Sequence, residues 1–133
     1  MPVTRRNTSV RIARAIARYP DNNAKEKVWR LFLENNEDRS NEYLVDSLVT
    51  ICLKQKVTLK DEELKTILEA EKSHKFVYSL VYTGLYEVSE NKLIAKEMIL
   101  KYRPELPPEA FSTEARKLFV KSAIHNYSSI KNF

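Results

Sequence analysis

Apolar side chains recur three and four residues apart along most of this chain, which is the spacing of an α-helix with one buried face. The stretch from residue 76 to residue 88 departs from this pattern. Apolar or aromatic residues fall on every side of it, and Glu87 is its only charge. A segment of this kind must be covered by other elements all round. We therefore expect residues 76–88 to form the central element of the core.

Valine and tyrosine, which favour strands, are common in this central stretch. However, both alternating sets of its side chains are largely apolar, so a half-buried strand would have no solvent face. Its length of thirteen residues also exceeds the usual strand of about 5–6 residues. We predict a buried helix in which Gly84, the only glycine of the chain, lets another helix approach closely. Tyr78, Tyr82 and Tyr86 are expected in the core with hydrogen-bonded hydroxyls.

Six further helices are predicted from the same periodicity and from residues that start or stop helices. Asn23 is expected to cap the second helix, with Glu26 returning the bond as in a capping box. Ser40 and Ser89 are expected to cap the third and sixth helices. The seven predicted helices span approximately residues 8–19, 24–34, 41–56, 58–71, 74–88, 90–103 and 108–126.

The sixth helix and the last helix each have a predicted apolar face. The face of the sixth helix comprises Ile94, Ala95, Met98, Ile99 and Tyr102. The face of the last helix comprises Phe111, Ala115, Leu118, Phe119 and Ala123. Each set is expected to point into the core.

The scarcity of glycine favours an all-α fold, because tight β-turns usually need Asn-Gly or Asp-Gly and neither dipeptide occurs. Short connections make sequential helices antiparallel neighbours. We predict a compact helical bundle of about six to seven antiparallel helices. The alternative is a solenoid-like stack of helical hairpins, since hairpins would begin near residues 24, 58 and 90. Residues 1–7 are expected to be a flexible basic arm, and residues 8–133 a single all-helical domain.

One segment of about thirty residues is similar to a tetratricopeptide repeat. Four residues have the same spacing as the corresponding positions of that repeat: Tyr86, Ala95, Ile99 and Pro107. The positions of that family's tryptophan and glycines are occupied by other residues: Ser79, Thr83 and Glu90. The other two predicted hairpins show no matching pattern, so the family is not assigned.

Positive charge is concentrated at the two ends of the chain. Residues 1–20 contain five basic residues and no acidic one, and residues 112–133 contain four basic residues and one acidic one. Between them, residues 21–111 contain fourteen basic and seventeen acidic residues, the mixture of an ordinary solvated surface. The net charge of +5 therefore reflects the termini and not the body of the protein.

Five arginines form the N-terminal basic group: Arg5, Arg6, Arg11, Arg14 and Arg18. The last three share one helix face, because they recur three and four residues apart. Such a stripe suits contacts with nucleic-acid phosphates. An amphipathic, arginine-rich, acid-poor segment is also typical of mitochondrial targeting. The third interpretation is docking on an acidic protein surface, either the chain's own or a partner's.

Three residues of the last helix form the C-terminal basic group: Arg116, Lys117 and Lys121. If the two ends of the chain meet in space, these residues would extend the arginine stripe into one basic patch. The ordinary alternative is a solvated outer face opposite the apolar stripe of this helix.

Residues that support catalysis or metal binding are sparse. Cys52 is the only cysteine, which excludes a disulfide within the chain and fits a reducing, intracellular compartment. His74 and His125 have no histidine or cysteine at ligand spacing. No apolar run reaches the roughly 20 residues that span a bilayer. We therefore predict no catalytic, cofactor-binding or metal-binding residues, no cofactor, no membrane span and no enzymatic activity.

These patterns predict a non-enzymatic helical module that mediates protein–protein interaction as a scaffold or adaptor. Its expected partner is another protein or a second copy of the chain, and its expected location is the cytoplasm, with the mitochondrion as alternative. The alternative function is a nucleic-acid-binding accessory protein that contacts the phosphate backbone through the N-terminal arginines.

Overall fold

The computed structural model describes residues 5–35, 41–71 and 80–126, and it confirms the predicted all-α helical bundle. Seven α-helices and one short 3-10 helix make up this part of the chain, and no β-strand occurs within it. In order, the elements are α1 (Arg5–Arg18), α2 (Ala24–Glu34), α3 (Asn41–Gln55), α4 (Asp61–Ala70), α5 (Leu80–Val88), α6 (Lys92–Tyr102), η1 (Pro108–Phe111) and α7 (Thr113–Asn126).

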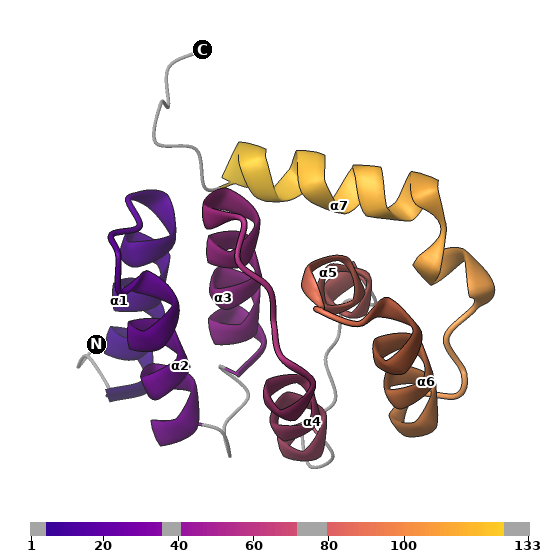
Figure 1. Ribbon diagram of the computed structural model, residues 1–133. Helices are drawn as coiled ribbons and strands as arrows, with labels where there is room; N and C mark the ends of the chain where they lie inside the picture. The colour runs from indigo at the N-terminus through magenta and orange to yellow at the C-terminus, as the bar shows by residue number, and fades with distance from the viewer. Residues whose placement is uncertain (1–4, 36–40, 72–79, 127–133) are drawn as a thin grey trace.

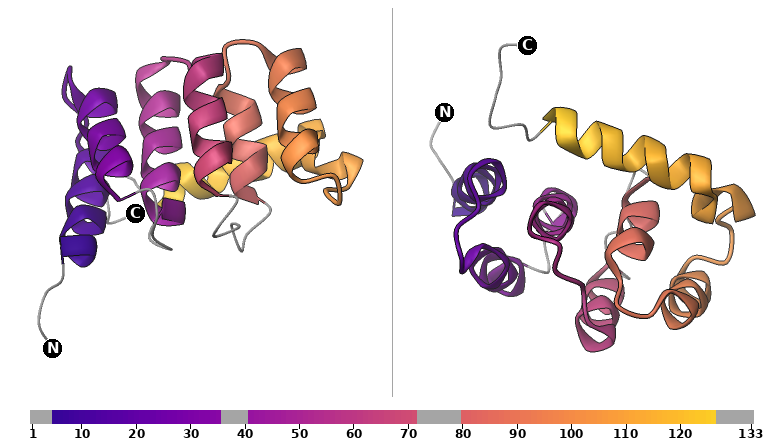
Figure 2. Two further views of the ribbon diagram at one scale, coloured as in Figure 1. Left: turned by 90° about the horizontal axis from the view of Figure 1, so that it is seen from below. Right: turned by 45° about the horizontal axis from the view of Figure 1, so that its top comes forward.

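The first six helices form three hairpins that stand side by side (Figure 2). Helices α1, α3 and α5 form one layer, in which α3 contacts both its neighbours, and α2, α4 and α6 form the other. Helix α7 runs across the first layer and packs on α5 and α3 (Figure 1). The alternative prediction was a stack of hairpins beginning near residues 24, 58 and 90, whereas the observed hairpins begin with α1, α3 and α5, so the helices are paired differently from that alternative.

The turns of the three hairpins are joined by hydrogen bonds. The Gln55 side-chain amide donates to the carbonyl of Asp21 at 2.6 Å, which links the second hairpin to the first. The Leu59 N–H donates to the Val88 carbonyl at 2.8 Å, and the Glu90 N–H donates to the Leu59 carbonyl at 2.9 Å. These bonds hold the hairpins in register, because each turn is tied to the next.

Two predicted caps lack the expected side-chain bond, although Asn23 does occupy the N-cap position of α2. The backbone N–H of Asn23 donates to the Asp21 carboxylate at 3.0 Å, whereas Glu26 pairs with Arg30 at 2.7 Å, so no capping box forms. The Ser89 hydroxyl donates back to the carbonyl of Leu85.

Four helix starts also differ from the predictions; one is that of α7, which begins at Thr113 and not near residue 108, because residues 108–111 form the 3-10 helix η1. The cap of α6 is Asn91, whose side chain accepts from the Ile94 N–H at 3.2 Å. Helix α4 begins at Asp61 and not at residue 58, because the preceding backbone bonds to the turn of the third hairpin. Helix α1 begins at Arg5, so residues 5–7 of the predicted arm are helical. Ser40 lies outside the described residues.

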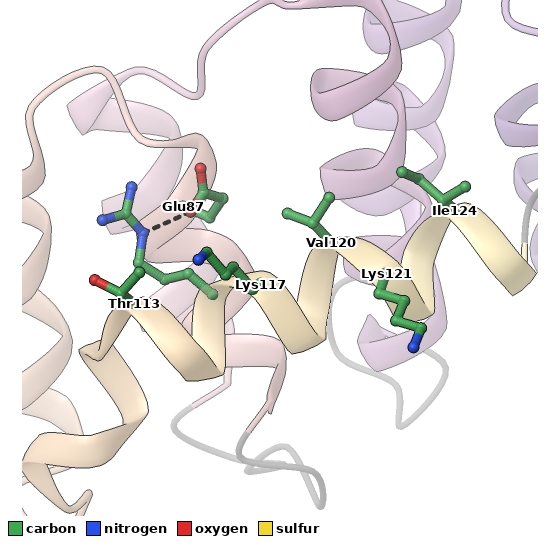
Figure 3. Close-up of a pocket in the computed structure, with 7 residues that line it drawn as sticks. Glu87, Thr113, Lys117, Val120, Lys121 and Ile124 are labelled. Carbon is green, nitrogen blue, oxygen red and sulfur yellow. Dashed lines mark hydrogen bonds and ion pairs between the residues drawn. The ribbon is translucent and has the colours of Figure 1, made fainter.

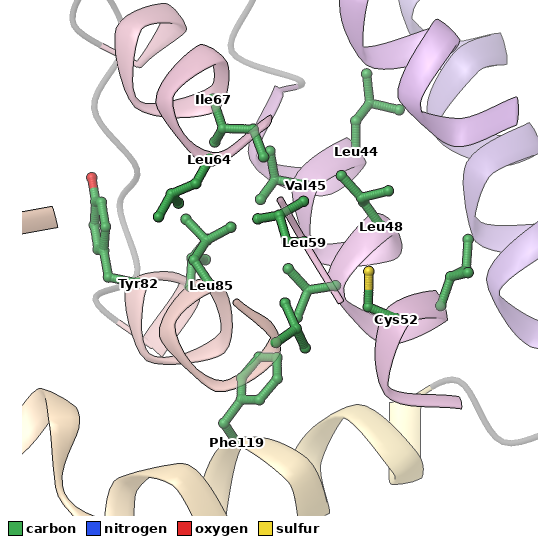
Figure 4. Close-up of a cluster of buried hydrophobic side chains, with 14 of the residues drawn as sticks. Leu44, Val45, Leu48, Cys52, Leu59, Leu64, Ile67, Tyr82, Leu85 and Phe119 are labelled. Atoms are coloured by element: carbon green, nitrogen blue, oxygen red, sulfur yellow. The ribbon is translucent and has the colours of Figure 1, made fainter. Parts of the chain in front are cut away.

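The core lies between the two layers and α7 (Figure 4). Leu48 of α3, Leu64 of α4 and Leu85 of α5 are fully buried and converge there. The part of the predicted central helix that the structure describes is α5, and most of its side chains are buried. Residues 74–79, including Tyr78, lie outside the described part. The central position expected for this stretch is therefore confirmed for residues 80–88.

Gly84 is the point at which α7 comes closest to α5. A Cβ atom placed on Gly84 would lie 2.5 Å from Cζ of Phe119 and 2.6 Å from its Cε1. The backbone of Gly84 has a negative φ, so glycine is needed here for space and not for conformation. The predicted close approach of another helix is confirmed.

Two residues predicted to point inward are exposed. Ile94 of α6 is 40% exposed and Leu118 of α7 is 59% exposed. Helix α6 packs mainly against α4 and α5, and α7 buries only a narrow face that includes Phe119 and Ala123. Neither helix is covered widely enough to bury its whole apolar stripe.

A buried polar cluster joins the ends of α4, α5 and α6. The hydroxyl of Tyr82 donates to the Glu71 carboxylate at 2.7 Å and accepts a hydrogen bond from the Arg103 guanidinium. Burial raises the pKa of Tyr82, and the hydrogen bond to Glu71 raises it further. The predicted core tyrosine with a bonded hydroxyl is confirmed for Tyr82. Tyr86 is half-buried and packs edge-on against Phe111, with ring centroids 5.1 Å apart.

Among the described residues, none of the helices combines the length and the apolar character that crossing a bilayer requires.

Candidate interaction surface

A shallow groove follows the outer face of α7 (Figure 3). Its volume is about 570 Å³. Six lining residues belong to α7 and recur at helical spacing on the side away from Phe119, and one belongs to α5. The lining residues are Glu87, Thr113, Arg116, Lys117, Val120, Lys121 and Ile124. We call this surface the α7 groove.

One end of the α7 groove is closed by an ion pair. The Nε of Arg116 donates to the Glu87 carboxylate at 2.6 Å, and the guanidinium also lies over the ring of Tyr86, 5.4 Å from its centroid. The hydrogen bond to Glu87 raises the pKa of Arg116. Arg116, one of the predicted site residues, is therefore engaged within the fold and attaches α7 to α5.

The two lysines of the α7 groove differ from Arg116 in their contacts. Lys117 and Lys121 are exposed, and the described part of the chain gives neither of them an ion pair. They lie one helical turn apart. Between and beside them, Val120 and Ile124 point in the same direction from α7, and Ile124 is 58% exposed. The groove thus has an aliphatic floor and two cations at its rim.

Only part of the arginine stripe of α1 lies against the rest of the protein, since Arg14, like Arg11, is exposed. The guanidinium of Arg14 sits over the ring of Tyr43, 5.2 Å from its centroid. Arg18 is half-buried, and its carbonyl accepts from the Lys54 ammonium at 3.1 Å. Arg11 is exposed. The side chains of Arg5 and Arg6 lie outside the described part, although their backbone begins α1.

A second cavity, of about 360 Å³, lies where α1, α3, α5 and α7 meet. It contains Arg14 together with two acidic residues of α3, Glu42 and Asp46. Helix α7 contributes Phe119, Ser122 and Ala123 to its wall. Arg14 thus shares its surroundings with carboxylates of its own chain, as the docking interpretation of the arginines expects.

The described residues do not bring the two basic groups into one site. Arg14 lines the second cavity, whereas Arg116, Lys117 and Lys121 line the α7 groove on another face of α7. Helices α1 and α7 both contribute to the second cavity, but α7 presents apolar and hydroxyl side chains there.

Val120 and Ile124 were missed as site residues when the chain was read as a sequence. They form, with Lys117 and Lys121, a second stripe at spacings of three and four residues. That spacing is visible without a structure. The second stripe is less conspicuous than the one through Phe119, which contains the residues predicted to face the core.

The other candidate chemical groups are isolated. Cys52 is buried, and its burial raises the pKa of its thiol to about 11, so the reactive thiolate is scarce at neutral pH. His125 is exposed near the end of α7, and His74 lies outside the described residues. Within the described residues, no group of three histidine, cysteine or acidic side chains is arranged to hold a metal ion.

Comparison with known proteins found no matching family model, no matching curated protein and no matching solved structure.

Proposed function

We propose that this chain is a non-enzymatic protein-interaction module, a scaffold or adaptor, which binds a segment of a partner protein along the α7 groove. The observation that carries the proposal is the apolar floor of that groove. Ile124 is 58% exposed, and Val120 is half-buried and packs against the core; together they form a stripe with the aliphatic stems of two lysines. An apolar stripe with a charged rim is the general form of a protein-binding surface.

The fold supports such a role, because α7 is held rigidly. Phe119 is inserted against Gly84, and Arg116 is paired with Glu87. A binding surface on an anchored helix loses little conformational entropy when a partner docks, so more of the interaction energy appears as affinity.

The proposal can be tested by photo-crosslinking in cells that produce the protein naturally. A photo-reactive amino acid at position 124 should form covalent adducts with a defined protein, and Val120→Asp should abolish them. The same probe at position 65, on the exposed face of α4, is the matched control. Equal adducts at both positions, or adducts that survive the Asp substitution, would contradict binding along the α7 groove.

The alternative of nucleic-acid binding through α1 has a separate test. If the arginine stripe contacts phosphates, replacing Arg11, Arg14 and Arg18 together by alanine should abolish retention on heparin and on RNA or DNA. Unchanged retention would remove this alternative. Arg14 is exposed but lies over Tyr43 and beside carboxylates of α3, which would compete with phosphates for its charge.

A further inference from the structure

Resting on the proposed function, we infer that the segment bound in the α7 groove is an acidic, amphipathic helix of about three turns. We infer that the segment is acidic from the charge of the groove. Of its three cations, Arg116 is neutralised by Glu87, whereas Lys117 and Lys121 have no ionic partner among the described residues. The groove therefore has an excess of two positive charges, and charge complementarity selects carboxylates in the partner.

The length of the groove sets the length of the partner segment. Its lining runs along α7 from Thr113 to Ile124. At about 1.5 Å per residue, eleven steps correspond to roughly 16 Å, or about three helical turns. A partner helix lying along α7 would place acidic residues one turn apart opposite Lys117 and Lys121, which are themselves one turn apart.

Apolar residues of the partner must supply most of the affinity. Exposed ion pairs contribute only about 0.2–1 kcal/mol each, so two lysines alone cannot hold a ligand. The stripe through Val120 and Ile124 offers the aliphatic area that a helix can cover with leucine-like residues at positions i, i+3, i+4 and i+7. The lysines then select which apolar helix binds and speed its association.

The same features disfavour a nucleic acid in this groove. Two unpaired cations offer few phosphate contacts, and the affinity and salt dependence of nucleic-acid binding both scale with the number of phosphates neutralised. A phosphate backbone would also leave Val120 and Ile124 uncovered. An acidic helix satisfies both the charge and the apolar floor.

The inference can be tested with two designed peptides of fourteen residues. Both carry leucines at the i, i+3, i+4 and i+7 positions, and the remaining positions are glutamate in one peptide and lysine in the other. Fluorescence anisotropy of the labelled peptides against the full chain should show the glutamate peptide binding roughly tenfold or more tightly than the lysine peptide, because the lysine peptide places like charges opposite Lys117 and Lys121.

Substitutions in the α7 groove test whether the peptides bind there. The double substitution Lys117→Glu with Lys121→Glu should reverse the preference between the two peptides. Its matched control, Lys65→Glu with Lys101→Glu, changes the net charge by the same amount on exposed positions of α4 and α6 and should leave the preference unchanged. Val120→Asp should weaken both peptides, since it places a carboxylate in the apolar floor. Circular dichroism and thermal melts verify that each variant folds.

Several outcomes would overturn the inference. Equal or tighter binding of the lysine peptide would show that the groove does not select acids, while leaving the proposed function intact. Binding of neither peptide would also reject an acidic helix, and photo-crosslinking at position 124 would then decide the proposed function separately.

Two competing occupants give distinguishable results. If a second copy of the chain fills the groove, sedimentation equilibrium will show self-association that the Glu substitutions at 117 and 121 abolish. The exposed Leu93 of α6, flanked by Glu90 and Glu97, is the surface such a copy would offer. If single-stranded RNA competes with the glutamate peptide and binds more tightly, the groove is a phosphate site. Either result rejects the inference.

Discussion

The two basic helices of this protein, α1 and α7, carry their charge in opposite ways. Arg14 of α1 covers Tyr43 and lines a cavity with carboxylates of α3, and the C-terminal end of α1 accepts hydrogen bonds from Lys54. On α7, by contrast, Lys117 and Lys121 extend from an exposed face and have no ionic partner among the described residues. One arginine of α1 is thus drawn onto a neighbouring helix of its own chain, whereas the two lysines of α7 are not.

The number of basic residues on a helix therefore does not by itself give the positive charge that is available for binding a partner. Helix α1 packs against α2 and α3 and therefore has neighbours on two sides, whereas α7 crosses the end of the first layer and buries one narrow face. The neighbours of a helix decide which of its side chains are used internally. Four substitution experiments test how firmly the side chains of α1 and α7 are used within the fold.

The largest expected effect comes from removing the ring that anchors α7. Phe119→Ala should lower the free energy of unfolding by about 3–5 kcal/mol, because it deletes a large buried side chain and leaves a cavity against Gly84. Urea denaturation followed by circular dichroism measures the change. Leu118→Ala, one residue earlier and exposed, is the control and should cost far less. A loss below about 1 kcal/mol for the Phe119 variant would mean that α7 is not docked as described.

The second largest effect is expected from filling the space between Gly84 and the Phe119 ring. Gly84→Ala should destabilise the protein by about 1–3 kcal/mol, although alanine favours a helix by about 1 kcal/mol, because the new methyl group would overlap the Phe119 ring. In the Phe119→Ala background the same substitution should become neutral or stabilising. A double-mutant cycle from urea denaturation gives the coupling. Independent, additive effects of the two substitutions would refute the close contact.

A smaller effect should separate the arginines of α1 from one another. Arg14→Ala should reduce stability by about 0.5–1 kcal/mol through loss of the contact with Tyr43, whereas Arg11→Ala should change it much less. Thermal melts at low and high salt measure both variants. Equal effects of the two substitutions would show that the contact with Tyr43 does not stabilise the fold, and that Arg14 is as little used by the protein as Arg11.

The smallest effect is expected for the lysines of α7. Lys117→Ala and Lys121→Ala should leave the free energy of unfolding within about 0.5 kcal/mol of the parent protein, because the described structure uses neither ammonium group. Arg116→Ala should cost more, up to about 1 kcal/mol, through loss of the pair with Glu87. Thermal melts rank the three variants. A stability loss at Lys117 equal to that at Arg116 would show that this lysine has a structural role.

The sequence by itself determined the helical class, the order of the helices and the burial of the segment around Tyr82, since these follow from periodicity and from the lack of charge. It also marked Gly84 as a point of close approach, because a lone glycine inside an apolar helix has a packing reason. Local patterns were less reliable at the helix ends. Asn23 and Ser89 are good capping residues, but the Asn23 N–H donates to the Asp21 carboxylate and not to Glu26, and Asn91 takes the capping role expected of Ser89.

Only the tertiary structure decided which charged and apolar side chains remain available. Leu118 and Phe119 are adjacent and both apolar, yet one is exposed and the other fills the space above Gly84. Arg116 and Lys117 are adjacent and both basic, yet Glu87 lies within reach of the first alone. The periodicity of a chain gives the faces of a helix, but which face is covered depends on neighbours distant in the sequence. For that reason the helices were predictable from the sequence, and the α7 groove appeared once α7 was placed across α5 and α3.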